Sequence, residues 1–291
     1  MKEAIVLGVI NGAISAVLAV GLVLVYKGSR VFNFAQGEFG TVAAFVAWLT
    51  IAGEGWPYAL GALLAVAAGA AMGFATERLV VRPLFDSPRV TLLVATAGVA
   101  LGAIQLQLII GRPEGRVLGP AIGGRGVSVL GVLITPQEFL IFGLLILIGV
   151  GLTWFFSRTR LGSGILAASS DPLAAELIGI SSRRVSTILW TAAGGLGGLA
   201  GLLLVGAPGQ TLAPGFVTRN ALLAAFAAAV LGGIDRVIGA FVGGLVIGIS
   251  QQIAQFYLLQ RNVPSPDVIV LMGLLLAVLL VRPQGLVGKA A

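Results

Sequence analysis

Long apolar runs separated by short polar breaks dominate this chain of 291 residues. A helix needs about 20 mostly apolar residues to cross a hydrocarbon core about 30 Å thick, and most of the runs reach or approach that length. The pattern predicts an all-α fold, a polytopic transmembrane helical bundle of about eight or nine spans, formed as one domain over residues 1–291. The short runs at 37–52 and 221–233 are candidates for re-entrant segments. The runs cover residues 4–26, 37–52, 58–81, 90–110, 136–157, 185–206, 221–233, 237–259 and 267–281.

Composition supports a membrane protein and narrows its chemistry. Of the residues, 58% are hydrophobic and 10% are charged, against about 25% charged in an ordinary soluble domain. The chain has no cysteine and no histidine, which excludes disulfides, thiolate metal sites and a hydrolytic pair of serine and histidine. We therefore expect neither a metal site nor an enzyme activity in this chain.

The sequence contains no phosphate-binding loop of the G-x-x-x-x-G-K-[ST] type, because Lys2, Lys27 and Lys289 are its only lysines and none fits that motif. We therefore expect this chain to bind no cofactor. If transport is driven by ATP, the nucleotide must bind to a separate chain.

The formal net charge of +7 comes from basic residues scattered singly or in pairs between the apolar runs. This distribution is typical of topology signals rather than of a nucleic-acid surface. With residues 158–184 in the cytoplasm, the positive-inside rule predicts an external N-terminus and a cytoplasmic C-terminus. The basic residues then inside are Lys27, Arg30, Arg78, Arg82, Arg89, Arg158, Arg160, Arg183, Arg184, Arg236, Arg282 and Lys289.

The predicted cytoplasmic loop 158–184 carries the signals of a short helix over 172–178. Asp171 suits the N-cap, Pro172 the first helical position and Gly179 a left-handed C-cap. Such a helix is too short to be stable alone, so it either packs on its own bundle or docks to a cytoplasmic partner. Leu173 and Leu177 would share the contacting face. The candidate coupling residues are Asp171, Pro172, Leu173, Ala174, Ala175, Leu177 and Gly179.

Two regions place polar residues and glycines inside the apolar pattern, near 30–40 and near 206–236. Broken spans in corresponding parts of two halves point to a transport pathway, although no clear repeat joins these two. Glu38 either faces the bundle interior or simply favours the positive end of a helix dipole. Gln105 and Gln107 either bond between helices or line a pore. The pathway candidates are Asn33, Gln36, Glu38, Gln105 and Asn220.

Glycine pairs four residues apart recur in the apolar runs, as Gly194 with Gly198 and Gly239 with Gly243 show. Small residues at this spacing let helix backbones approach closely in a bilayer. The pattern predicts helix-packing faces. The residues assigned to them are Gly194, Gly198, Gly201, Gly239 and Gly243.

Over nearly its whole length the sequence resembles the branched-chain amino acid permease family of bacterial ABC importers, specifically the shorter of the two membrane subunits. The resemblance rests on Asn-Phe-Ala-Gln-Gly-Glu at 33–38, Arg82-Pro83-Leu84, Arg-Thr-Arg-Leu-Gly at 158–162 with the following Asp171-Pro172, and the alanine-rich run 224–233. Gln36 stands where many relatives carry histidine.

The resemblance implies a permease subunit of the bacterial inner membrane, most similar to importers of branched-chain or other hydrophobic amino acids. It implies three kinds of protein partner: a second related permease, two cytoplasmic ATPases that bind the ATP, and an external substrate-binding protein. The chain would also contact membrane lipid, and we expect it to bind no nucleic acid. The helix at 172–178 would be the coupling helix that seats in an ATPase. A permease for urea or short amides and an autonomous channel or secondary carrier are the alternatives.

Overall fold

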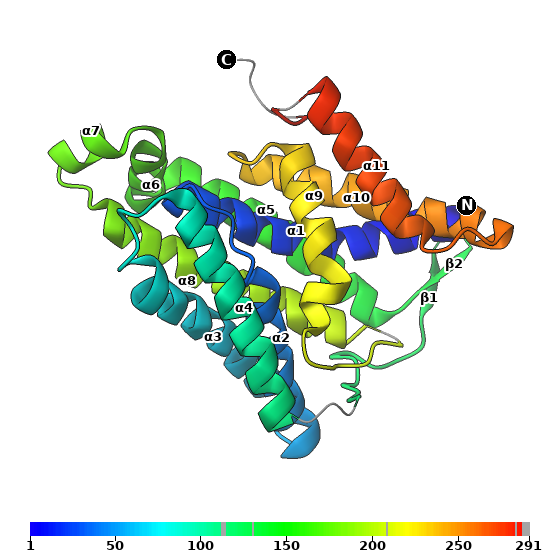
Figure 1. The fold of residues 1–291 in the computed structure, drawn as a ribbon. Coiled ribbons are helices and arrows are strands. Elements are labelled where there is room, and N and C mark those ends of the chain that lie inside the picture. Colours follow the sequence, from blue (N-terminus) through cyan, green and yellow to red (C-terminus); the bar gives the residue numbers. More distant parts are fainter. Residues whose placement is uncertain (112–114, 130, 208, 283, 287–291) are drawn as a thin grey trace.

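The computed structural model describes residues 1–111, 115–129, 131–207, 209–282 and 284–286, so Lys289 lies outside the described residues. The described chain is mostly helical (Figure 1), and six of its helices are long and apolar enough to cross a membrane. The predicted all-α transmembrane bundle is confirmed. The six are α1 (Lys2–Ser29), α3 (Tyr58–Thr76) continued by η2 (Glu77–Val81), α4 (Arg89–Gly111), α5 (Pro136–Arg158), α8 (Ser182–Val205) and α10 (Val237–Leu258) continued by η4 (Leu259–Arg261).

Three further apolar helices are shorter than a full span. They are α2 (Gln36–Ala47) continued by η1 (Trp48–Gly53), η3 (Thr218–Leu222) continued by α9 (Leu223–Gly232), and α11 (Pro266–Val281). The short runs at 37–52 and 221–233 thus form helices, and the described residues that precede these helices, 31–35 and then 206–207 and 209–215, are not helical. The predicted total of eight or nine spans therefore holds only approximately, with six full-length helices and these shorter ones.

Helices α1 and α8 form the centre of the bundle. The apolar window of α1 is 72% buried and that of α8 is 61% buried, against 22% in α4 and 11% in α5. Helix α1 packs against α8 and α10, and α8 packs against α2 and α3. The faces of α4 and α5 left exposed are apolar, as expected for contact with lipid or another membrane subunit.

Glycines occur where the central helices come closest. A Cβ at Gly194 would overlap the carbonyl of Gly69, and one at Gly201 would overlap the backbone of Gly40. Gly239 and Gly243 face the α9 backbone at Gly232 and Ala228 in the same way, and Gly198 lies beside Ala65. In a bilayer the hydrophobic effect does not drive helices together, because lipid tails are as apolar as the side chains. Close backbone contact of this kind stabilises helix association by van der Waals packing instead.

The two ends of the bundle differ in structure (Figure 1). At one end, β1 (Val127–Val129) pairs antiparallel with β2 (Val132–Ile134), with Val127 opposite Ile134, and this hairpin lies beside the start of α1. At the other end lie α6 (Arg160–Ser170) and α7 (Pro172–Leu177). We call these the hairpin end and the α7 end. The hairpin is a small departure from an all-α fold. Its strands are rich in β-branched residues, which favour extended backbone. Gly131 lies in the turn with φ 84°, a conformation that glycine adopts without strain.

Candidate coupling surface and helix junction

The segment at the α7 end is capped by its own side chains. The Ala174 N–H donates to Asp171 Oδ1 at 3.0 Å, and the Gly162 N–H donates to Thr159 Oγ1 at 2.9 Å. These bonds fix the starts of α7 and α6, because the first N–H groups of a helix have no partner within it. Gly179 adopts φ 86°, as expected of a left-handed cap, and α7 ends at Leu177, one residue before the predicted end.

Helix α7 presents aliphatic side chains that its own bundle does not cover. Leu173 is 72% exposed, Leu177 is 83% exposed and Ile178 is 72% exposed, whereas Ala175 is buried. The helix therefore rests on the bundle through Ala175 and leaves Leu173, Leu177 and Ile178 exposed, with Leu173 also at the edge of a cleft behind α7. We call these three residues the α7 leucine face.

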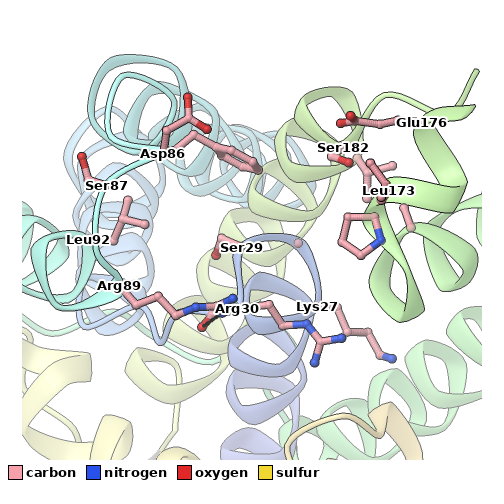
Figure 2. Close-up of a pocket in the computed structure, with 15 residues that line it drawn as sticks. Lys27, Ser29, Arg30, Asp86, Ser87, Arg89, Leu92, Leu173, Glu176 and Ser182 are labelled. Carbon is pink, nitrogen blue, oxygen red and sulfur yellow. Dashed lines mark hydrogen bonds between the residues drawn. The ribbon is translucent and has the colours of Figure 1, made fainter.

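Behind α7 lies a cleft of about 440 Å³, bounded by the end of α1, the connection between α3 and α4, α7 and the start of α8. Figure 2 shows Lys27, Arg30 and Arg89 along one side of this cleft, with Asp86 and Glu176 on the other. The cleft separates α7 from the α3–α4 connection, and α7 contacts α6 and α8.

Arg30 connects the end of α1 to three other parts of the α7 end. Its guanidinium donates to the Ser169 carbonyl of α6 and pairs with Asp235 at 3.5 Å, and its own carbonyl accepts from Arg89 Nη1 at 3.0 Å. Asp235 belongs to the turn between α9 and α10. Arg30 therefore joins the end of α6 to the central helix α1 and to the turn between α9 and α10.

The two broken regions of the sequence meet inside the bundle. We call the meeting point the junction, formed by the start of α2, the segment 215–218 and Gln107 of α4. Asn33 Oδ1 accepts from the Ala35 N–H at 2.9 Å, and Asn33 Nδ2 donates to Gln36 Oε1 at 3.2 Å. Gln36 Nε2 then donates to the Ala193 carbonyl of α8 at 2.8 Å. Asn33 and Gln36 thus hold the start of α2 and join it to α8.

Glu38 is the central polar group of the junction. It is completely buried, and its carboxylate accepts from Gln107 Nε2 at 2.7 Å and from Thr218 Oγ1 at 2.5 Å. Gln107 Oε1 accepts from the Gly215 N–H at 2.9 Å, and Thr41 Oγ1 accepts from the Val217 N–H at 3.1 Å. Both half-length helices α2 and η3–α9 begin here, so their positive N-terminal ends stabilise the carboxylate.

Two of the predicted pathway residues lie elsewhere. Gln105 is on an exposed side of α4, and Asn220 is exposed and donates to the Phe216 carbonyl at 2.8 Å. Gln107, which the prediction left out, is the glutamine of α4 that reaches the junction. Residues two positions apart point to different sides of a helix, so the pair could not both face Glu38, and the sequence alone did not show which one does.

Comparison with known proteins places this arrangement in a family. Residues 4–279 match the family described as "Branched-chain amino acid transport system / permease component". The chain is 31% identical to the high-affinity branched-chain amino acid transport system permease protein BraD of Pseudomonas aeruginosa, over 99% of this chain and 95% of BraD. The chain belongs to this permease family. It is also 31% identical to LivH of Escherichia coli, over 97% of this chain and 94% of LivH.

The fold of this permease is also found in a solved structure with little sequence similarity. PsaBC from Streptococcus pneumoniae in complex with Fab matches with a TM-score of 0.52 and 13% identity, over 97% of this chain and 92% of that chain. Identity at this level supports the shared fold alone. Among the described residues, no group of three or more acidic side chains is placed to hold a metal ion.

Proposed function

We propose that this chain is the membrane-spanning subunit of an ATP-driven importer of branched-chain amino acids, working with a second permease, two cytoplasmic ATPases and an external substrate-binding protein. The proposal rests on family membership, since the relatives BraD and LivH are named as high-affinity branched-chain amino acid permeases. The observation that carries the coupling role is the exposed α7 leucine face.

The α7 leucine face supports docking to a partner rather than packing within the chain. Three aliphatic side chains more than 70% exposed on one capped element form an apolar surface that monomeric proteins seldom leave to water. A helix of six residues gains little stability by itself. An ATPase groove that receives Leu173 and Leu177 would both cover this surface and hold the helix.

The charge distribution supports a cytoplasmic α7 end. Basic residues lie at the helix ends there, with Lys27 in the last turn of α1 and Arg30 just after it, Arg158 at the end of α5, Arg160 at the start of α6 and Arg183 in the first turn of α8. Positive residues favour the cytoplasmic side of a bacterial membrane. This orientation leaves the N-terminus and the hairpin end outside.

The link from α7 to Arg30 and α1 supports a route for coupling. ATP-driven closure of the two ATPases would displace α7, and α6 would carry this displacement to the end of α1 through Ser169 and Arg30. The junction supports a second role, because α2, α4 and α9 are joined there by side-chain hydrogen bonds rather than by apolar packing alone. Rearrangement of packed helices between two discrete states is a common basis of such switching.

The alternative interpretations are not favoured. BraD and LivH carry amino acid names rather than urea or amide names. An autonomous channel or secondary carrier would give the exposed α7 leucine face no role.

The proposed function is tested by purifying the tagged chain from its host in mild detergent and identifying co-purified proteins by mass spectrometry. We expect two ATPases and a second permease. The complex, reconstituted in liposomes with its binding protein, should take up leucine only when ATP is supplied to the ATPase side. Recovery of the chain alone, with leucine transport that needs no ATP, would overturn the proposal.

A further inference from the structure

The cleft behind α7 gathers positive charge that its neighbours only partly neutralise. Lys27, Arg30 and Arg89 lie along one side of it (Figure 2), at the end of α1 and the start of α4. Arg30 pairs with Asp235, whereas the Lys27 ammonium makes no hydrogen bond or ion pair with the residues that the structure describes. Arg30 and Arg236 lie close enough to Lys27 to repel its charge, and Asp235 attracts it. The basic side of the cleft therefore holds more cations than Asp235 can pair.

The acidic residues of the cleft do not remove this excess. Asp86 and Glu176 lie on the other side of the cleft (Figure 2). Asp86 pairs with Arg183 of α8 at 3.7 Å, and Glu176 is an exposed residue of α7. The cleft thus keeps its opposite charges apart, and an anionic group inside it would be attracted to the basic side.

A second feature of the cleft is a hydroxyl group without a partner. Ser182 lines the cleft at the start of α8, and its Oγ is buried and makes no hydrogen bond with the described residues. The N-cap residue Ser181 adds no side-chain hydrogen bond to the start of this helix. A hydroxyl group donates to the oxygens of an anion, and the start of a helix favours negative charge. This wall of the cleft therefore also suits an anionic ligand.

An apolar surface beside the cleft indicates which kind of anion fits. Arg89 is the first residue of α4, and Val90 and Val94 in the next turn are 68% and 66% exposed. Phe85 and Leu92 add apolar side chains to the cleft itself. A phosphate group at Arg89 would therefore lie where acyl chains can follow the exposed side of α4. Basic pockets between spans on the cytoplasmic side are recognition sites for anionic lipid headgroups.

We propose that this cleft binds the phosphate of an anionic phospholipid headgroup, held by Lys27, Arg30 and Arg89. The acyl chains lie along the exposed side of α4, and the Ser182 hydroxyl meets the headgroup from the other wall. Ammonium and guanidinium groups are strong donors to phosphate oxygens. Because the cleft separates α7 from the α3–α4 connection, the bound headgroup fills the space between these two segments and limits how far α7 can move toward α4.

Lipid binding by the complete complex tests this proposal. The complex is delipidated in mild detergent and mixed with phosphatidylglycerol, and bound lipid is measured by native mass spectrometry. We expect Lys27→Gln with Arg89→Gln to weaken binding by about tenfold or more, because each basic residue near a lipid surface contributes to the affinity. Arg78→Gln with Arg160→Gln is the matched control. It removes the same charge from exposed positions outside the cleft lining and should bind lipid as the wild type does.

A charge-preserving variant separates the loss of charge from a disturbed fold. Lys27→Arg with Arg89→Lys keeps both cations and should retain lipid binding. Inorganic phosphate, added as a competitor, distinguishes a lipid from a soluble phosphate ligand and should leave the lipid bound, because it lacks the acyl contacts. Equal lipid affinity for the cleft variant and the Arg78 and Arg160 control would overturn the proposal, as would release of the lipid by phosphate alone. Neither result would bear on the proposed import function, because lipid binding is measured without transport.

Discussion

The α7 segment and the junction both interrupt the apolar pattern of the chain, but they satisfy their side chains in opposite ways. In α7, the polar groups are satisfied locally by Asp171, and the apolar groups Leu173 and Leu177 are left uncovered. In the junction, Glu38 and its polar neighbours are buried, and their partners come from α4 and η3, far away in the sequence.

This difference indicates what each region contacts. A segment that completes its own hydrogen bonds and exposes leucines is suited to contact with another chain. Burying those leucines against a partner gains hydrophobic free energy and breaks none of the segment's own hydrogen bonds. A buried carboxylate that accepts hydrogen bonds from two other elements has its partners inside the chain, where an unsatisfied polar group is costly. Substitutions in the junction should therefore affect the fold, and substitutions in α7 should affect assembly and coupling.

The largest effect is expected from Gly37→Val in the junction. A Cβ at this position would lie 2.7 Å from the Thr218 Cα, so the backbones of α2 and η3 would have to separate. Overpacking of this kind costs about 1–3 kcal/mol or more, and we expect little folded protein by size-exclusion chromatography in detergent. Gly98→Val in α4 has nothing within 4 Å of the added Cβ and should behave as wild type. Equal yield and melting temperature for the two variants would contradict the close contact.

The next effect is expected from Leu177→Asp in the α7 leucine face. Because Leu177 is 83% exposed, the melting temperature of the isolated chain should not change. Leucine uptake should fall by at least about tenfold through loss of contact energy and charge burial in the ATPase groove, with ATP hydrolysis no longer coupled to uptake. Leu177→Met preserves an apolar contact and should retain uptake. Normal uptake by Leu177→Asp would remove α7 from the coupling role.

A smaller effect is expected from Glu38→Gln. One acceptor oxygen becomes an NH₂ group, so either Thr218 or Gln107 loses its acceptor, at a cost on the order of 1–3 kcal/mol. The chain should still fold, and uptake should fall by a few-fold. The double variant Glu38→Gln with Gln107→Glu restores a donor opposite an acceptor and should recover melting temperature. Wild-type uptake kinetics for the single variant would limit Glu38 to a structural role.

The smallest effect is expected from Asp235→Asn at the α7 end. Asp235 is largely exposed and pairs with Arg30 at 3.5 Å, and exposed ion pairs contribute about 0–1 kcal/mol. Uptake should fall by about twofold or less, and the loss should disappear at high salt as screening increases. A loss of uptake as large as that of Leu177→Asp would show that the turn between α9 and α10 has a direct part in coupling.

The two regions also differ in how far sequence predicts them. The cap, the proline and the terminal glycine of α7 are local signals, so its start and its two leucines followed from neighbouring residues. The choice between Gln105 and Gln107 had no local signal, since both are glutamines in the same apolar run.

The sequence by itself determined the class of protein, the positions of most helices and the side preference of the charges, because hydrophobic length and basic flanks depend only on neighbours along the chain. The tertiary structure alone decided that α2 and η3–α9 begin at one buried carboxylate and that α7 leaves its leucines uncovered. These features are contacts between segments tens to hundreds of residues apart, and the apolar pattern of a membrane helix carries little information about which of its faces meets which neighbour.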